Sequence, residues 1–364
     1  MSATHDQHPA SSPEPAVLPT AARRAPRPLV TLVGVTVALG AVLALLLAIF
    51  ILPSLKSGPH DLPVGVVGPP TALTRVEEAL ATSAPGAYDL QPFASADALT
   101  QAVEDREVVG GFVVEPTGIR AVVATAGSAA IAQSVSAAAQ GLGAATGVAV
   151  RTTDVVPLPA SDPSGIGIGG LAFPLVFGGI VPAVAFRSAF ARSDTWKLAG
   201  VGLFSLVGGM IVAAVLQFGF GSIEHAFWPV AASMALGIAA MSFPLSGLQR
   251  AFGGKGFTIG AMTMMFLGNP FAGIATTAAW LPAGLGAFGQ ILPPGATGTL
   301  VRSVAYFGGT GGLTAGLTLG AWVVAGLVIH TVGSVRAKAA PVVVATEGAA
   351  TEVDQREAVA TVGA

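Results

Sequence analysis

The chain has 364 residues, of which 52% are hydrophobic and 10% are charged, and its mean hydropathy is +0.74. This composition excludes an ordinary soluble globular protein and indicates one that crosses a membrane several times. Cysteine is absent, which excludes disulfides, thiolate metal sites and a cysteine nucleophile, and the net charge of −2 with an acidic excess between Lys56 and Asp162 argues against nucleic-acid binding.

The first predicted element is a long apolar helix. Residues 1–28 are rich in Pro, Ala and Ser, so we expect a disordered cytoplasmic tail that buries too little apolar surface to offset its ordering entropy. Residues 29–52 are almost entirely apolar and would form a helix about 36 Å long, enough to cross a ~30 Å hydrocarbon core. The run is too long for the apolar region of a signal peptide, so we expect an uncleaved first transmembrane helix.

Residues 53–165 have the mixed pattern of a small globular α/β domain. Short β-branched runs predict four strands, at 62–67, 88–93, 108–115 and 118–124. Helical periodicity predicts three helices, at 73–82, 95–106 and 128–148, with Ser95 as an N-cap. The last helix has a narrow apolar face, formed by Ile131, Val135, Ala138 and Leu142. Covering the sheet is the leading interpretation of this face, and a dimer contact is the alternative.

Residues 166–335 predict five further crossings, at 166–186, 198–218, 227–248, 257–277 and 313–335. Short cytoplasmic loops retain Lys and Arg. With the amino terminus inside, the inner segments contain Arg23, Arg24, Arg27, Arg187, Arg192, Lys197, Arg250, Lys255, Arg336 and Lys338. The short outer loops contain only Arg302. We therefore expect six transmembrane helices, an extracytoplasmic α/β domain between the first two, and cytoplasmic termini that include a disordered tail at 336–364.

An apolar segment broken by prolines lies before the last predicted helix. Residues 257–301 contain no Asp, Glu, Lys or Arg, yet Pro270, Pro282 and the pair Pro293–Pro294 interrupt any continuous helix. Broken backbone at membrane depth persists only where protein or a wet cavity covers it. We therefore predict a re-entrant segment at about 279–303, reached from the outer side.

Its candidate gate and pathway residues are Asn269, Pro270, Gln290, Pro293, Pro294 and Arg302. For Asn269 and Gln290, the simpler interpretation is that their amides satisfy backbone groups freed by the prolines. For Arg302, a structural anchor and a substrate-facing role are equally supported, because a charge at the bilayer centre is costly.

Other motifs have a structural and a functional interpretation. The inner loop with Arg187, Arg192, Asp194, Trp196 and Lys197 is either a solvated positive loop or a docking surface for a cytoplasmic partner, and Arg250 and Lys255 raise the same question more weakly. Small residues at Gly312, Gly316 and Gly320 would let the last helix approach a neighbour closely, and the same applies to Gly165, Gly167 and Gly170, which lack the strand that a dinucleotide site requires.

Enzyme motifs are weak or absent in the sequence. Ser246 and His330 raise the alternative of an intramembrane serine protease, although a lone helical serine more often bonds its own backbone. The only Gly-Lys pair, Gly254-Lys255, lacks the glycine and the Ser or Thr of a P-loop, and the five histidines are scattered. The chain is therefore expected neither to hydrolyse ATP by that route nor to hold a metal.

The order of these elements, with LGNPF at 267–271, Leu281-Pro282, Gly289-Gln290, LPPGA at 292–296, Arg302-Ser303 and the Val-rich strand LPVGVV at 62–67, resembles the permease subunit of type-2 ABC exporters. It is most similar to the bacterial branch related to phage-infection proteins, in its actinobacterial form, and the likeness covers most of residues 29–335. One departure is that no amphipathic interfacial helix precedes Leu29.

The resemblance implies a multi-pass protein of the bacterial plasma membrane that is not itself an enzyme. It implies a separate ATPase subunit that binds ATP, so no cofactor in this chain, together with a homodimer or paired permease, and the inner loop 187–197 as the ATPase contact. The exported substrate would be hydrophobic or amphipathic.

Two alternatives remain open at this stage. One is a non-transporting receptor, or a scaffold of an envelope or secretion complex, that acts through the outer domain. The other is secondary transport, which would need an intramembrane acidic residue, and no predicted span contains one.

Overall fold

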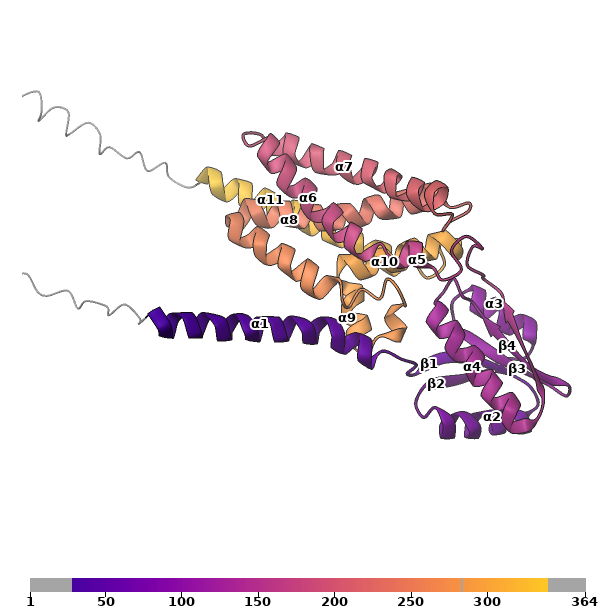
Figure 1. Cartoon of the computed structure of the whole chain (residues 1–364). Helices are drawn as coiled ribbons and strands as arrows, with labels where there is room; N and C mark the ends of the chain where they lie inside the picture. The colour runs from indigo at the N-terminus through magenta and orange to yellow at the C-terminus, as the bar shows by residue number, and fades with distance from the viewer. Residues whose placement is uncertain (1–27, 283, 340–364) are drawn as a thin grey trace, which may run out of the picture. The chain divides into compact units, whose positions relative to one another are not determined.

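The computed structural model describes residues 28–282 and 284–339, so nearly all of both predicted tails lies outside the described residues. The first element is helix α1, Pro28–Lys56, which contains the whole predicted first crossing (Figure 1, indigo). Its 29 residues span about 44 Å at ~1.5 Å per residue, more than a bilayer core needs. The contacts between residues divide the chain after Leu46, and the described residues from Leu47 onward form one compact unit.

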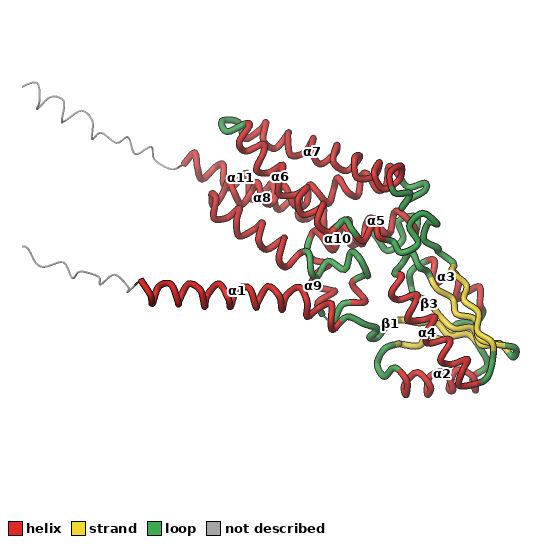
Figure 2. Tube along the Cα trace, in the orientation of Figure 1, coloured by secondary structure: helices red, strands yellow, loops and turns green. Residues whose placement is uncertain are grey.

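A five-stranded sheet lies between α1 and the later helices, and every other described element of the chain is helical (Figure 2). The strands are β1 Leu62–Val67, β2 Tyr88–Pro92, β3 Gly110–Glu115, β4 Gly118–Val123 and β5 Ala149–Asp154, in the order β2-β1-β3-β4-β5. All neighbouring pairs are parallel except the β3–β4 hairpin. The four predicted strands are confirmed, and β5 is a fifth that the sequence analysis missed.

Three helices cover the two faces of this sheet. Helices α2, Pro70–Ser83, and α4, Ala129–Thr146, share one hydrophobic core with residues such as Val64 and Phe112. Helix α3, Ala96–Glu104, packs on the opposite face, and the Ser95 side chain accepts a hydrogen bond from Ala98 N as the predicted N-cap. The predicted α/β fold of this region is therefore confirmed.

Close packing of α3 depends on glycine in the strands below it. A Cβ atom at Gly111 would come within 2.7 Å of the Leu99 side chain, and one at Gly65 would lie closer still. On the other face, α4 buries Ile131, Val135 and Leu142 in the sheet core, with Ala138 partly buried beside them. The leading interpretation of that apolar face, that it covers the sheet, is confirmed.

Five helices of the described chain are long and apolar enough to cross a membrane: Pro28–Lys56, Ile166–Ala189, Asp194–Gly219, Phe227–Gly268 and Leu313–Ala337. The second comprises α5, Ile166–Gly169, and α6, Ala172–Ala189, and the third comprises α7, Asp194–Ala214, and a π-helical turn, Val215–Gly219. The fourth is α8, Phe227–Thr263, with a π-helical turn, Met264–Gly268, and the last is α11, Leu313–Ala339.

Helix α8 contains the fourth predicted crossing but only the start of the fifth, which was predicted at 257–277: with its π-helical turn the helix ends at Gly268, just before Asn269 and Pro270. Its backbone breaks at Gly253, where φ is 67° and ψ is −154°. A Cβ atom at Gly260 would lie 3.0 Å from the Leu245 side chain, whereas a continuous helix would separate these residues by about 22 Å. The two arms of α8 therefore fold back on each other as a helical hairpin, which Figure 1 shows as a reversal of the ribbon.

The first arm of α8 is the centre of the helical region, because it packs against α6, α7 and α11. Small residues allow the contact with α11: a Cβ atom at Gly326 would clash with the backbone of Pro244, and one at Gly333 would lie 2.8 Å from Ala251 Cα. The glycines predicted for this role, Gly312, Gly316 and Gly320, differ in their surroundings. A Cβ atom at Gly312 would come within 2.6 Å of Ser303 Oγ, so this glycine does allow a close approach. The first two face Leu300, and Gly320 has no atom of the described chain within 4 Å.

Candidate functional site

The broken segment that the sequence singled out folds as short helical pieces. After the π-helical turn the chain is irregular up to a 3-10 turn at Ala278–Trp280, and then forms α9, Leu285–Ile291, and α10, Pro293–Tyr306. Leu292 joins the two helices in an extended conformation, with φ −87° and ψ 145°. Pro293 and Pro294 occupy the first turn of α10, where a missing N–H leaves no bond unmade. The predicted interruption at these prolines is confirmed.

Helix α10 is largely buried, even though it belongs to a broken segment. Nine of its 14 residues are buried: Pro293, Pro294, Gly295, Ala296, Thr297, Gly298, Val301, Arg302 and Ser303. It packs against α8, α9 and α11. Other helices therefore cover this part of the broken segment on several sides. Such cover is the condition under which interrupted helices persist at membrane depth.

Side chains complete the hydrogen bonds that the breaks leave open. Gln290 donates from Nε2 to the carbonyl oxygen of Ala272 at 3.3 Å and accepts from Thr299 Oγ1 at 2.6 Å. Trp322 on α11 donates from Nε1 to the Ile291 carbonyl at 2.8 Å. The interpretation of Gln290 as a group that satisfies freed backbone is therefore supported. Because it uses both ends of its amide, its side chain is held in one orientation.

Asn269 differs from Gln290, although the sequence suggested the same role for both. Its Oδ1 atom is buried and has no hydrogen-bond partner among the described residues. Pro270 follows it and is only partly buried. The amide of Asn269 therefore leaves one acceptor unused beside the start of the broken segment.

Arg302 is buried on α10, with only 6% of its surface exposed. It donates from Nη2 to the carbonyl oxygen of Ile274 at 2.6 Å. This bond ties α10 to the irregular stretch that precedes α9, which supports the interpretation of Arg302 as a structural anchor. The same side chain also lines a cavity, described below.

The sheet region, which consists of β1–β5 with α2, α3 and α4, contacts the broken segment between Asn269 and α10 at two places. Gly58 N, just before β1, donates to the carbonyl oxygen of Trp280 at 3.0 Å, and Trp280 packs against the core shared by α2 and α4. Phe307, at the end of α10, belongs to the core under α3. Both contacts flank α9 and α10, so they join the sheet region to the two ends of the stretch that contains these helices.

The predicted docking loop divides into a bonded and an exposed group. Asp194 binds Lys197 Nζ at 3.0 Å through one carboxylate oxygen and Arg250 Nε at 3.0 Å through the other. Arg250 Nε also lies 3.1 Å from Ser334 Oγ, so the cluster connects α7, α8 and α11. The remaining residues of the loop, Arg187, Arg192 and Trp196, are exposed. Sequence reasoning gave Arg250 only a minor role, because nothing in the sequence pairs it with Asp194.

The pair Ser246 and His330 does not form a catalytic dyad in this structure. Ser246 Oγ donates to the Ser242 carbonyl at 2.8 Å, which is the self-bonding expected of a helical serine. His330 is buried, and neither ring nitrogen has a hydrogen-bond partner among the described residues. Without a bond to the serine, the imidazole cannot act as its base in this geometry.

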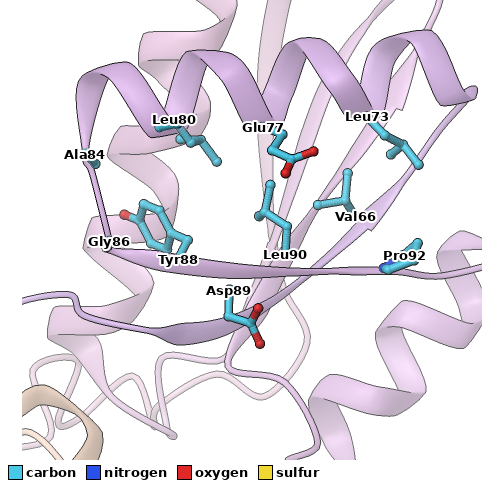
Figure 3. A pocket seen from close by; sticks show the side chains of 11 residues that line it. Val66, Leu73, Glu77, Leu80, Ala84, Gly86, Tyr88, Asp89, Leu90 and Pro92 are labelled. Carbon is cyan, nitrogen blue, oxygen red and sulfur yellow. The ribbon is translucent and has the colours of Figure 1, made fainter. Parts of the chain in front are cut away.

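A groove on the sheet region was not anticipated from the sequence. It lies between α2 and the edge strand β2 and has a volume of about 420 Å³. Figure 3 shows Leu73, Leu80 and Leu90 on its walls with the Glu77 carboxylate among them, whereas the Asp89 side chain points away on the other side of β2. Among the described residues, no group of three or more His, Cys, Asp or Glu could hold a metal ion.

Comparison of the chain with protein-family models, with curated proteins and with solved structures finds no match. The functional argument therefore depends on the elements and side chains described above. Two features carry most of it. One is the broken pair α9–α10, of which α10 is largely buried and which is attached to the sheet region through Trp280 and Phe307. The other is the set of exposed basic residues beside the Asp194 cluster.

Proposed function

We propose that this chain is the membrane-spanning permease subunit of an ABC-type exporter, which moves a hydrophobic or amphipathic substrate outward with a separate ATPase subunit. The observation that carries the proposal is the broken pair α9–α10, of which α10 is largely buried. The pair lies before the last long helix, and the flanking residues Trp280 and Phe307 contact the sheet region. Such a pair could change its packing when the sheet region or the helices move, as a gate requires.

In this proposal the chain crosses the bacterial plasma membrane six times. The crossings are α1, the joined α5 and α6, α7, the two arms of α8, and α11. The α9–α10 pair re-enters the membrane from outside, where the sheet region also lies, and both termini are cytoplasmic. The distribution of Lys and Arg supports this orientation.

The proposed substrate class follows from an apolar cavity of about 740 Å³. Its wall is formed by α5, α6, α7 and the π-helical turn that follows α7, with residues such as Leu171, Ile211 and Phe220. A cavity of this size and character suits a lipid tail or a similar apolar group. ATP would bind on the partner subunit, and two permease chains would form one pathway.

The proposed ATPase contact is the exposed pair Arg187 and Arg192 with Trp196. The test is to purify the tagged full chain from its native cell envelope and to identify co-purifying proteins that carry G-x-x-x-x-G-K-[ST]. The double variant Arg187→Glu/Arg192→Glu is expected to reduce the amount of co-purified ATPase at least tenfold without changing the melting temperature of the chain itself. The control is Arg75→Glu/Arg151→Glu, which reverses two exposed arginines of the sheet region. Substrate movement that needs no nucleotide would contradict the proposal.

The groove between α2 and β2 favours one other candidate, a receptor or scaffold that acts through the sheet region. Because β2 is an edge strand, its outer backbone groups are open to an additional strand. Ala81→Trp would fill the groove from its exposed rim. Loss of biological activity in that variant, together with full activity after Pro293→Ala/Pro294→Ala, would favour this candidate over the exporter.

A further inference from the structure

A second cavity, of about 250 Å³, lies where the sheet region meets α10. One wall comes from the end of α3, the loop that follows it and the start of α4, and includes Arg106, Val108 and Ser128. The other comes from the broken segment and includes Thr277, Gln290, Thr299 and Arg302. A site for one water needs on the order of 10–15 Å³ by the same measure, so this cavity has room for a phosphate-sized group and several waters.

Two arginines from distant parts of the sequence line this cavity. Arg302 is buried and donates to the carbonyl oxygen of Ile274. Arg106 is half-buried, donates weakly from Nη1 to the Thr310 carbonyl at 3.4 Å, and lies with Cζ 4.9 Å from the centre of the Phe307 ring. These contacts orient both guanidinium groups but neutralise neither of them.

No carboxylate balances this pair of positive charges. Among the described residues, neither Arg106 nor Arg302 forms an ion pair, and no Asp or Glu lines the cavity. Burial lowers the pKa of Arg106, because a desolvated guanidinium loses the hydration that favours its charged form. Buried charges are normally paired, so an unpaired guanidinium group in this cavity is unfavourable, more for buried Arg302 than for half-buried Arg106. An anion in the cavity would offset this desolvation.

Two hydroxyl groups on the cavity wall have a free hydrogen. Ser128 accepts a hydrogen bond from Ile131 N, so its own O–H is still available to donate. Thr277 has a buried Oγ1 with no partner among the described residues and a strained backbone, with φ 155°. Strain and an unused buried donor at the same residue are more often found at binding sites than elsewhere.

We propose that this cavity binds a phosphate group, held by the guanidinium groups of Arg106 and Arg302 and by the hydroxyl groups of Ser128 and Thr277. A phosphate oxygen is the acceptor that arginine pairs with best, because the planar fork donates two parallel bonds. The group could belong to a free phosphate or to the head group of an anionic lipid. This inference is independent of the export proposal, because it needs neither an ATPase nor a transported substrate.

The test measures binding to the purified full chain in a neutral detergent. Thermal unfolding is followed with increasing inorganic phosphate at constant ionic strength, and separately with dihexanoyl phosphatidylglycerol, since a ligand of the native state raises the melting temperature. Arg106→Gln and Arg302→Gln are each expected to weaken binding and so to raise the dissociation constant about tenfold or more. The matched control is Arg151→Gln, an exposed arginine on β5, and it should bind as the native chain does.

The outcomes separate the two sources and can overturn the proposal. Saturable binding of inorganic phosphate assigns the site to the free anion, and binding of only the phosphatidylglycerol assigns it to a lipid head group. If Arg302→Gln does not fold, Arg106→Gln and Thr277→Val carry the test, because both residues are at the wall and neither ties α10 to Ile274. Absence of saturable binding with both probes, or equal weakening by Arg151→Gln, would overturn the proposal.

Discussion

Thr299 on α10 donates a hydrogen bond to Gln290 on α9, with 2.6 Å between Thr299 Oγ1 and Gln290 Oε1. The same glutamine donates to the Ala272 carbonyl at 3.3 Å. One side chain thus joins both short helices to the irregular stretch before them. Because the prolines remove backbone donors, this amide contributes directly to the stability of the broken segment.

Gln290→Leu is expected to lower the free energy of unfolding by about 1–3 kcal/mol, since it leaves the carbonyl of buried Ala272 and the partly buried hydroxyl of Thr299 unpaired. The measurement is thermal unfolding of the purified chain in detergent. Gln249→Leu is the matched control, because the Gln249 Oε1 atom is buried and already has no partner among the described residues. Equal melting temperatures for the two variants would show that the Gln290 bonds add nothing.

Gly253→Ala tests the hairpin within α8. The backbone at Gly253 has φ 67° and ψ −154°, a region that only glycine occupies readily, so alanine should cost about 1–3 kcal/mol of stability. A Cβ atom there would have no neighbour within 4 Å, which leaves backbone strain as the only cause. Gly254→Ala is the control, because it has equal space without that conformation, and it should be neutral or slightly stabilising. If α8 were one continuous helix, both variants would be stabilising.

Asp194→Ala removes the carboxylate that holds Lys197 and Arg250 together at the start of α7 and the end of the first arm of α8. We expect a loss of about 1–2 kcal/mol, more than for a surface ion pair, because two partners lose their bonds at a partly buried position. Thermal unfolding provides the measurement. Glu224→Ala breaks the exposed pair of Glu224 with His225 and should leave the melting temperature unchanged. An effect of Asp194→Ala on ATPase recovery alone, with no loss of stability, would assign this cluster to docking instead.

Asp162 should make stability depend on pH. Burial alone would raise the pKa of Asp162, but hydrogen bonds from the N–H groups of Gly167 and Ile166, at 2.8 Å each, outweigh it and hold the pKa below its ordinary value of 3.8. A lowered pKa means that the folded state binds the proton less tightly than the unfolded state. Its stabilising contribution is therefore complete above about pH 4 and is lost as the pH falls through the folded pKa.

Asp162→Asn is expected to lower stability at pH 7 by about 1–3 kcal/mol, and the difference from the native chain should shrink below pH 4. Melting temperatures between pH 3 and pH 7 measure both effects. Asp89→Asn replaces an exposed carboxylate and serves as the control. A difference that stays constant down to pH 3 would exclude the Asp162 carboxylate as its source.

Much of the local structure follows from short-range properties of the sequence. A run of apolar residues about as long as a bilayer core predicts α1, and prolines at 293 and 294 predict the break between α9 and α10, because both rules act within one or two turns of chain. Ser95 is recognisable as an N-cap for the same reason. These predictions are confirmed by the structure. The membrane orientation and the export function remain predictions.

The elements that the sequence analysis missed depend on distant neighbours. Strand β5 has a polar, mostly exposed sequence, and it is a strand only because β4 supplies its backbone partners. The hairpin in α8 depends on one glycine whose conformation a stretch of helix formers does not reveal.

The sequence alone therefore determined that this is a helical protein with apolar spans, a broken segment before the last helix and a small α/β region. Only the tertiary structure decided which side chains meet. Arg106 and Arg302 are 196 positions apart in the sequence, yet they line one cavity. Asp194 and Arg250 form an ion pair across two helices. Such pairs arise from packing between distant segments, and no local pattern of residues encodes them.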